Sequence, residues 1–303
     1  MSNKAFMLAG RVGSCLVALG SLAISSTGSV LAGTWELELP RPVFDECPSF
    51  VDLYYRAWKI AHDHIRELPG LPSPRHMDEA LWDDRVWIWD TCFMVQYCKY
   101  LPKEFPGVES LENFYRVMLA DKATPLPRVK CEWPSNGRRG MTLDFMIHHP
   151  DNPPLFAWTE YRYALQTGDR ARLEKVYSQE RWLQRWFDLF ENFDPAAPQP
   201  HGSCCAVAAK RHADGYFWKG CPNGMDNTPR GRTATCPDAD VRECPNNRDL
   251  LWVDAIAQQG LSALYLSRIA GLLGKTEEAN NWELRYRAFK EKVNALYWDE
   301  KDG

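Results

Sequence analysis

Residues 224–230 are the segment whose residue types and spacing are best suited to chemistry. Their sequence, Gly-Met-Asp-Asn-Thr-Pro-Arg, holds the carboxylic acid of Asp226 on a loop bounded by glycine and proline. Glycosidic bonds are broken by two carboxyl groups, of which one protonates the leaving oxygen and the other activates water or attacks the sugar. Asp226 suits the general acid, a role that requires a raised pKa. The alternative is a simple turn, because Asp commonly occupies turns beside Gly and Pro.

An earlier segment carries groups that could hold a sugar. Asp90 can accept hydrogen bonds from hydroxyl groups, and it follows Trp87 and Trp89 directly. If this stretch enters its helix in extended form, the two tryptophans share one face and could form a stacking wall for sugar rings. The alternative is that both tryptophans belong to the core and that Asp90 caps a helix.

Two further polar residues are candidates for substrate contacts. Asn152 could reach a sugar in the same subsite as Asp90, or it could form a turn before Pro153. Arg230 could contact substrate or pair with a carboxylate near Asp226, or it could anchor its loop through an ion pair. Both readings remain open from the residues alone.

Three segments resemble, in the same order, motifs of the mannosyl-oligosaccharide glucosidase and mannosylglycerate hydrolase family, to which trehalases are related. Residues 87–91, Trp-Ile-Trp-Asp-Thr, resemble its Trp-Asp sugar-binding motif. Residues 152–158, Asn-Pro-Pro-Leu-Phe-Ala-Trp, resemble Gln-Pro-Pro-Leu-x-Ala-Trp, and residues 224–230 resemble Gly-(Leu/Met)-Asp-Asn-Ser-Pro-Arg. This chain departs from the family pattern with asparagine at 152 and threonine at 228.

The resemblance implies an inverting glycosidase that cleaves α-linked oligosaccharides or small glycosides. It makes Asp226 the general acid and places the general base, a Glu, beyond residue 303, so the 303-residue chain is expected to be inactive or weak. Glu132, Asp144 and Glu160 are possible substitutes only if the chain is complete. The substrate-binding residues that it implies are Trp87, Trp89, Asp90, Asn152, Trp158 and Arg230.

Composition narrows the possible partners. The chain has 303 residues, 45% of them hydrophobic, which is enough for one large core or two modest ones. Its net charge of −4 is spread without a basic stripe, which argues against nucleic acid and against anionic membranes. The 13 tryptophans supply aromatic surface for sugar rings as well as for a core. The expected partner is therefore an oligosaccharide or glycoside, with no cofactor.

The N-terminus has the pattern of an export signal. Lys4 and Arg11 precede an apolar run over residues 16–24, which is too short to span a bilayer, and small residues precede Gly33. Residues 1–32 are therefore predicted to be a signal peptide of a periplasmic or secreted protein that leaves the membrane after cleavage.

Nine cysteines follow this predicted signal. Five of them bracket Asp226: Cys204, Cys205, Cys221, Cys236 and Cys244. In an exported chain without CxxC pairs, such a cluster favours a disulfide-stapled loop over a metal site. The adjacent His148 and His149 are also a weak metal candidate, because neighbouring residues point apart and no third ligand is spaced nearby.

Apolar residues spaced by three and four predict helices throughout the chain. The expected ranges are 47–65, 89–101, 108–120, 154–167, 170–193, 249–273 and 277–297, separated by long loops at 66–86, 121–152 and 194–248. Gly168-Asp169 and Gly274-Lys275-Thr276 are expected to end one helix with glycine and to cap the next with Asp169 or Thr276, forming two helical hairpins. No alternating pattern is long enough for a major sheet.

Serial hairpins with long loops predict an all-α fold, in which residues 33–303 form part of an α/α toroid. The resemblance implies an (α/α)6 toroid of twelve helices, whereas seven are predicted, so the chain is expected to be an N-terminal portion that is incomplete at its C-terminus. One rival is a non-catalytic helical scaffold that binds glycans or proteins. Another is a toroid lyase or epimerase with a His or Tyr base, which the family motifs argue against.

Overall fold

The computed structural model describes residues 34–69, 71–78, 88–118, 155–192, 210–217 and 251–301. The chain divides into two compact units, Met1–Glu38 and Leu39–Gly303. In the first unit the structure describes a single 3-10 helix, η1 (Thr34–Glu38). The second unit contains the remaining elements.

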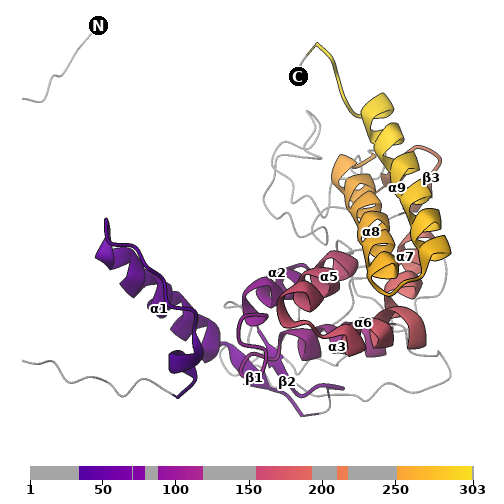
Figure 1. Ribbon diagram of the computed structural model, residues 1–303. Helices are drawn as coiled ribbons and strands as arrows, with labels where there is room; N and C mark the ends of the chain where they lie inside the picture. The colour runs from indigo at the N-terminus through magenta and orange to yellow at the C-terminus, as the bar shows by residue number, and fades with distance from the viewer. Residues whose placement is uncertain are drawn as a thin grey trace, which may run out of the picture. The chain divides into compact units, whose positions relative to one another are not determined.

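The second unit is mainly helical in its described ranges, which confirms the all-α prediction (Figure 1). Its helices are α1 (Pro48–Asp63), α2 (Ile88–Cys98), α3 (Gly107–Met118), α5 (Phe156–Thr167), α6 (Arg170–Leu173), the π-helical segment η2 (Glu174–Gln179), α7 (Trp182–Glu191), α8 (Val253–Leu272) and α9 (Thr276–Leu296). Each predicted helix except one is found with bounds shifted by a few residues.

The exception is the helix predicted over residues 170–193, where that prediction is wrong. The structure has three pieces, α6, η2 and α7, and Arg181 before α7 has a positive φ of 54°. A left-handed residue cannot continue an α-helical hydrogen-bond ladder. The spacing of the buried side chains agrees with this break. Tyr177 and Trp182 are both buried but five positions apart, which differs from the three-and-four spacing of one continuous helix face.

Two short β-hairpins lie within segments that were predicted to be loops. Strand β1 (Ile65–Glu67) pairs antiparallel with β2 (Arg75–Met77), and β3 (Lys210–His212) pairs antiparallel with β4 (Gly215–Phe217). Strands of three residues are too short to show an alternating pattern in sequence. They add no major sheet to the described ranges, in agreement with the prediction.

The first predicted helix junction is confirmed. Gly168 ends α5 in the left-handed region with φ 73°, and its N–H donates to Ala164 O at 2.8 Å. Asp169 then caps α6, because its Oδ1 accepts from the N–H of Arg172 at 2.9 Å. Glycine tolerates the positive φ and aspartate satisfies an N–H that the helix leaves unpaired.

The second junction is confirmed in part. Gly274 has φ +79° between α8 and α9, as predicted for a glycine that ends a helix. Thr276 was expected to cap α9, and this is wrong, because Thr276 is already the first helical residue. The capping position is held by Lys275, which makes no side-chain capping bond.

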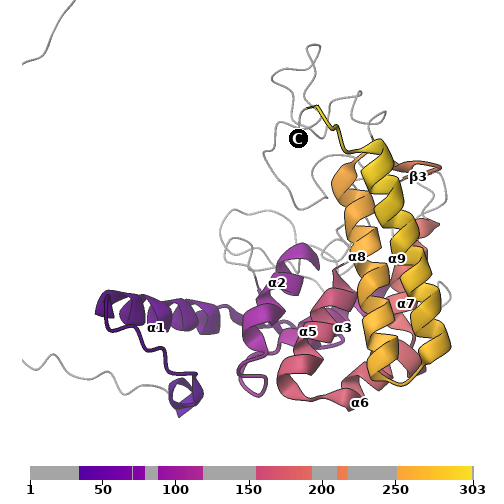
Figure 2. The same cartoon turned by 45° about the horizontal axis from the view of Figure 1, so that its top comes forward.

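Helices α8 and α9 lie side by side in both views, and α5 packs against α8 (Figures 1 and 2). The main core is formed by the facing sides of α2, α3, α5, α7 and α8, and its largest fully buried members include Tyr115, Phe156 and Trp186. The predicted apolar face of α9 packs on it through Trp282, Tyr286 and Phe289. Burial of these faces is the main favourable term that holds the helices together.

The cysteine predictions fall largely outside the described residues. Cys204, Cys205, Cys221, Cys236 and Cys244 are not described, and the disulfide prediction stays a prediction. Among the cysteines that are described, Cys47, Cys92 and Cys98 are free, and the last two are buried. No helix in the described ranges combines the length and apolar character of a membrane span.

Candidate functional site

A pocket of about 810 Å³ lies between α1 and α2 and is walled mainly by aromatic and aliphatic side chains. Helix α1 contributes Tyr54 and Trp58, and α2 contributes Phe93 and Tyr97, with Tyr100 just beyond its end. Its acidic lining residues are Asp78 and Asp90, and His64 lies between α1 and β1. A pocket of this size with few polar groups has the usual character of a small-molecule site.

Helical periodicity brings these side chains to one place. On α1, Tyr54, Trp58 and Ala61 are four and three positions apart, so they share one face of the helix. On α2, Asp90, Phe93 and the residues at 94 and 97 follow the same rule. The pocket therefore lies between one face of α1 and one face of α2.

Ring contacts hold the pocket wall in place. Trp58 meets Tyr97 edge to face, with ring centroids 5.9 Å apart and planes at 90°, and it also contacts Phe105 at 5.2 Å. Trp58 is buried, whereas Tyr54 is half-buried and its hydroxyl donates to Pro40 O at 2.7 Å. Such edge contacts add to the energy of burial. Burial also raises the pKa of Tyr54 above its ordinary value of 10.0.

The two carboxylates occupy different settings. Asp78 is fully buried, its N–H donates to His64 O at 3.0 Å, and its Oδ2 lies 3.8 Å from Nε of Arg66. Asp90 is half-buried in the first turn of α2, where the partial positive charge of a helix N-terminus favours an anion. Both can accept hydrogen bonds from a bound hydroxyl or amine.

Trp89 and Trp158 both contact Phe93, which lines the pocket. Trp89 contacts Phe93 with ring centroids at 4.9 Å, and Phe93 contacts Trp158 at 5.6 Å. Both tryptophans also pack against the main core, and neither is among the described residues that line the pocket. Trp89 and Asp90 are adjacent within a helix, so their side chains diverge by about 100° and Trp89 is not the wall beside Asp90.

Trp87, Asn152, Asp226 and Arg230 lie outside the described residues. The convergence of Trp89, Asp90 and Asp226 at one cleft therefore stays a prediction. Asp90 is the one sequence-predicted substrate-binding residue that the described part of the chain places in the pocket wall.

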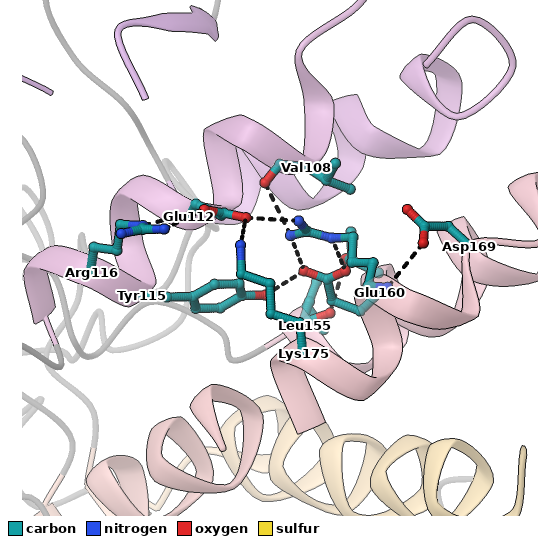
Figure 3. Close-up of polar contacts among 10 residues, drawn as sticks. Val108, Glu112, Tyr115, Arg116, Leu155, Glu160, Asp169 and Lys175 are labelled. Atoms are coloured by element: carbon teal, nitrogen blue, oxygen red, sulfur yellow. Dashed lines mark hydrogen bonds and ion pairs between the residues drawn. The ribbon is translucent and has the colours of Figure 1, made fainter. Parts of the chain in front are cut away.

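Glu160, one of the acids considered as a substitute general base, lies in a buried ion-pair network (Figure 3). Its side chain is fully buried, and Arg172 binds both of its oxygens. Tyr115 donates its hydroxyl proton to Oε1 at 3.1 Å. A carboxylate occupied in this way on both oxygens is structural. Glu132 and Asp144 are outside the described residues.

Sequence reasoning missed most of the pocket wall, namely Tyr54, Trp58, Asp78, Phe93 and Tyr97. The available signal was the four-residue spacing of Tyr54 with Trp58 and of Phe93 with Tyr97, which predicts an aromatic stripe on each helix. Such a stripe is equally typical of a core face, so only the placement of α1 against α2 identifies the pocket.

The arrangement can bind a ligand that has both an apolar face and hydrogen-bonding groups. Aromatic rings provide stacking surfaces, and carboxylate oxygens accept hydrogen bonds from hydroxyl or amino groups. Groups of three or more His, Cys, Asp or Glu side chains that could hold a metal are absent from the described ranges.

Comparison of the chain with protein-family models, with curated proteins and with solved structures found no match. The three sequence motifs and the pocket that carries Asp90 are therefore the features of the chain that bear on its function.

Proposed function

We propose that the protein is a glycoside hydrolase that cleaves α-glycosidic bonds of oligosaccharides or small glycosides with inversion of configuration. The pocket between α1 and α2 is the sugar subsite, and Asp226 is the general acid. The protein acts after export, and its fold is an α/α toroid of the (α/α)6 kind.

The observation that carries this proposal is the position of Asp90 in an aromatic-lined pocket. A sugar ring has an apolar face that stacks on aromatic rings and hydroxyl groups at its edge that donate to carboxylates. Trp58, Tyr97 and Phe93 supply the first kind of contact, and Asp90 supplies the second. The position of Asp90 supports the expectation that the aspartate of the Trp-Asp motif binds sugar.

The helix arrangement supports the toroid part of the proposal. The α5–α6 and α8–α9 pairs are two helical hairpins, and their apolar faces share one core. Repeated hairpins around a common core are the building plan of an α/α toroid.

The second candidate is a non-catalytic helical scaffold that binds glycans or proteins. One observation favours it, namely the row of exposed apolar side chains on α1, which includes Phe50, Leu53 and Ile60, each more than half exposed. Exposed apolar patches often mark interaction surfaces.

Two measurements on the same purified protein separate these functions. Isothermal titration calorimetry measures binding of α-linked gluco- and manno-disaccharides, and an assay for reducing ends measures their hydrolysis. A hydrolase binds at least one of them and releases reducing sugar, and NMR of the first product shows the inverted anomer.

Binding without turnover, measured on a protein that includes the general base expected beyond residue 303, would support the scaffold and overturn the hydrolase. Absence of both binding and turnover would overturn the hydrolase and the glycan-binding form of the scaffold. Asp90→Asn should weaken binding of the disaccharide, because Asp90 lines the pocket. The control is Asp52→Asn, at an exposed position on α1 outside the pocket, which should leave binding of the disaccharide unchanged.

A further inference from the structure

We propose that α1 is the contact surface between two copies of this chain, which pair their α1 helices antiparallel about a twofold axis. The inference assigns a partner to the exposed apolar side chains of α1. It does not rest on the proposed function, because its test measures the oligomeric state of the protein and not the binding of sugar.

Four apolar residues form a stripe along α1, called here the α1 stripe: Phe50, Leu53, Ala57 and Ile60. Their spacing of three, four and three positions is that of the seam through which two helices pack in a coiled coil. Phe50, Leu53 and Ile60 are 56%, 60% and 51% exposed, and Ala57 is exposed as well. A surface helix usually buries its apolar stripe, so the α1 stripe is available to a second helix.

Contacts that join α1 to later parts of the chain lie on another side of the helix. Trp58 contacts the rings of Tyr97 and Phe105, and His62 Nε2 lies 2.8 Å from Glu104 Oε1. At about 100° per residue, Trp58 lies about 120° around the helix from the middle of the α1 stripe. A second helix can therefore pack on the stripe while these contacts stay in place.

The α1 stripe begins at the rim of the pocket and extends beyond it. Ala57 and Ile60 are among the residues that line the pocket. Phe50 and Leu53 lie one to two turns towards the N-terminus of α1, outside the described lining. Leu53 is therefore the position at which the stripe can be tested separately from the pocket.

Charges on one flank of the α1 stripe favour a second copy as the partner. Arg56 and Asp63 are both exposed and lie on the same flank, seven positions or about 10 Å apart. In an antiparallel pair about a twofold axis, a contact of Arg56 with Asp63 of the partner subunit requires the reciprocal contact as well. One arrangement therefore forms two ion pairs, and it sets Ala57 of each copy opposite Ile60 of the partner subunit.

The charges also select the antiparallel direction. In a parallel pair the flank of Arg56 would meet the other flank of the partner's helix, which carries the uncharged Tyr54 and Ala61. The remaining charged residues near the middle of α1, Asp52 and Lys59, lie about 120–140° around the helix from the middle of the α1 stripe. They are therefore not part of the contact.

The length of α1 sets the expected strength of the pair. The helix has 16 residues, which corresponds to a length of about 24 Å. Two helices of this length form an interface at the low end of the range for specific association. We therefore expect a reversible dimer with a Kd on the order of 10 µM.

Sedimentation velocity of the whole protein over about 1–100 µM tests the inference. The protein should be mainly a monomer at the lowest concentration and mainly a dimer at the highest. Leu53→Asp should raise the Kd at least about tenfold, because it places a carboxylate in the apolar seam. The matched control is Leu284→Asp on α9, at a position that is 64% exposed, and it should leave the Kd unchanged.

A charge exchange tests the antiparallel arrangement. Arg56→Glu should raise the Kd about tenfold, because two contacts between like charges replace the two ion pairs. The double variant Arg56→Glu/Asp63→Lys should return the Kd to within about threefold of the wild type, since it restores both pairs in reverse. Lys59→Glu is the control for reversal of a positive charge on α1 and should keep the wild-type Kd. Circular dichroism confirms that each variant is folded.

The outcomes separate this inference from the proposed function. A protein that stays a monomer at about 100 µM would overturn the inference, and so would a dimer that Leu53→Asp does not weaken. A double variant no better than Arg56→Glu, or an equal effect of Lys59→Glu, would overturn the antiparallel ion pairs. Binding of sugar by Leu53→Asp should remain that of the wild type, so the loss of the dimer leaves the proposed function standing.

Discussion

Arg172 binds Glu160 through two parallel hydrogen bonds that join α6 to α5. Nε donates to Oε2 and Nη2 donates to Oε1, both at 2.7 Å. This paired geometry matches the planar guanidinium to the planar carboxylate. Arg172 also reaches Glu112 Oε1 at 3.0 Å and Val108 O at 3.1 Å, so one side chain links three helices (Figure 3).

Arg172→Met should destabilise the fold strongly. Glu160 has no exposed side-chain surface, so the variant leaves a buried carboxylate without its cation. Removal of one partner from a buried pair costs about 3–5 kcal/mol. Urea unfolding followed by circular dichroism measures the change in the free energy of unfolding.

An exposed pair on α9 provides the control for Arg172→Met. Arg287 and Glu283 are four positions apart, and the arginine side chain is 65% exposed. Arg287→Met should change the free energy of unfolding by about 0.5 kcal/mol or less. The double variant Arg172→Met/Glu160→Met should recover much of the loss, because it removes both charges. Equal effects of Arg172→Met and Arg287→Met would contradict a structural role for the buried pair.

Glu112 should make the free energy of unfolding depend on pH in the acidic range. Burial alone would raise the pKa of Glu112, but a hydrogen bond from Lys175 and the charges of Arg172 and Lys175 together hold that pKa below its ordinary value of 4.5. A carboxyl group with a lowered folded-state pKa contributes stability that is complete above the unfolded-state value and is lost as pH falls through the folded-state value.

The measurement for Glu112 compares the wild type with Glu112→Gln between about pH 3 and pH 7. The free-energy difference between them should be largest near neutral pH, at about 1.5–3 kcal/mol, as for a hydrogen bond to a charged group. This free-energy difference should become smaller as the pH falls below the ordinary pKa of Glu112. Parallel stability curves over the whole range would show that this network does not act through the ionised carboxylate.

The two helix junctions allow a matched test of capping. Asp169→Ala removes a side chain that accepts from the N–H of Arg172, and it should cost about 1 kcal/mol. Thr276→Ala is the comparison, since Thr276 lies inside α9 and does not act as its N-cap. It should cost a few tenths of a kcal/mol at most, because Ala is the better helix former. Equal losses in thermal unfolding would mean that the assigned capping roles are wrong.

The cysteine cluster around Asp226 should contain at least one disulfide. We expect Cys221, Cys236 and Cys244, with Cys204 or Cys205, to supply the pair, since an exported chain folds under oxidising conditions. Mass mapping of non-reduced peptides from the exported protein identifies the linked residues. If all five thiols react freely with an alkylating reagent in the native, oxidised protein, the loop is not stapled by its own cysteines.

The sequence predicted most of the helices because their apolar faces are long and periodic. Leu183, Trp186 and Phe190 on α7 are buried as their spacing indicates. The break at Arg181 was missed because a non-glycine residue in the left-handed region has no strong sequence signal. The short β-hairpins were missed because three-residue strands have too few positions for a pattern.

The candidate site was less predictable than the fold. Asp90 could be selected from its motif, but Trp58 and Tyr97 are part of the pocket only because α1 lies against α2. An aromatic stripe alone does not distinguish a core face from a binding wall. Trp89 illustrates the converse, because a residue of the same motif packs largely on the core.

The role of Asp226 as general acid is tested most directly by Asp226→Asn. The test uses a protein that includes the general base expected beyond residue 303, because the 303 residues alone are expected to be inactive or weak. The amide keeps the shape of the side chain but cannot deliver a proton, so turnover of an unactivated α-linked disaccharide by that protein should fall roughly 10²–10⁴-fold while its affinity stays nearly unchanged. The loss should be much smaller for a nitrophenyl glycoside, whose leaving group needs little protonation. An Asp226→Asn protein that hydrolyses the disaccharide at the wild-type rate would contradict the account and reduce residues 224–230 to a structural loop.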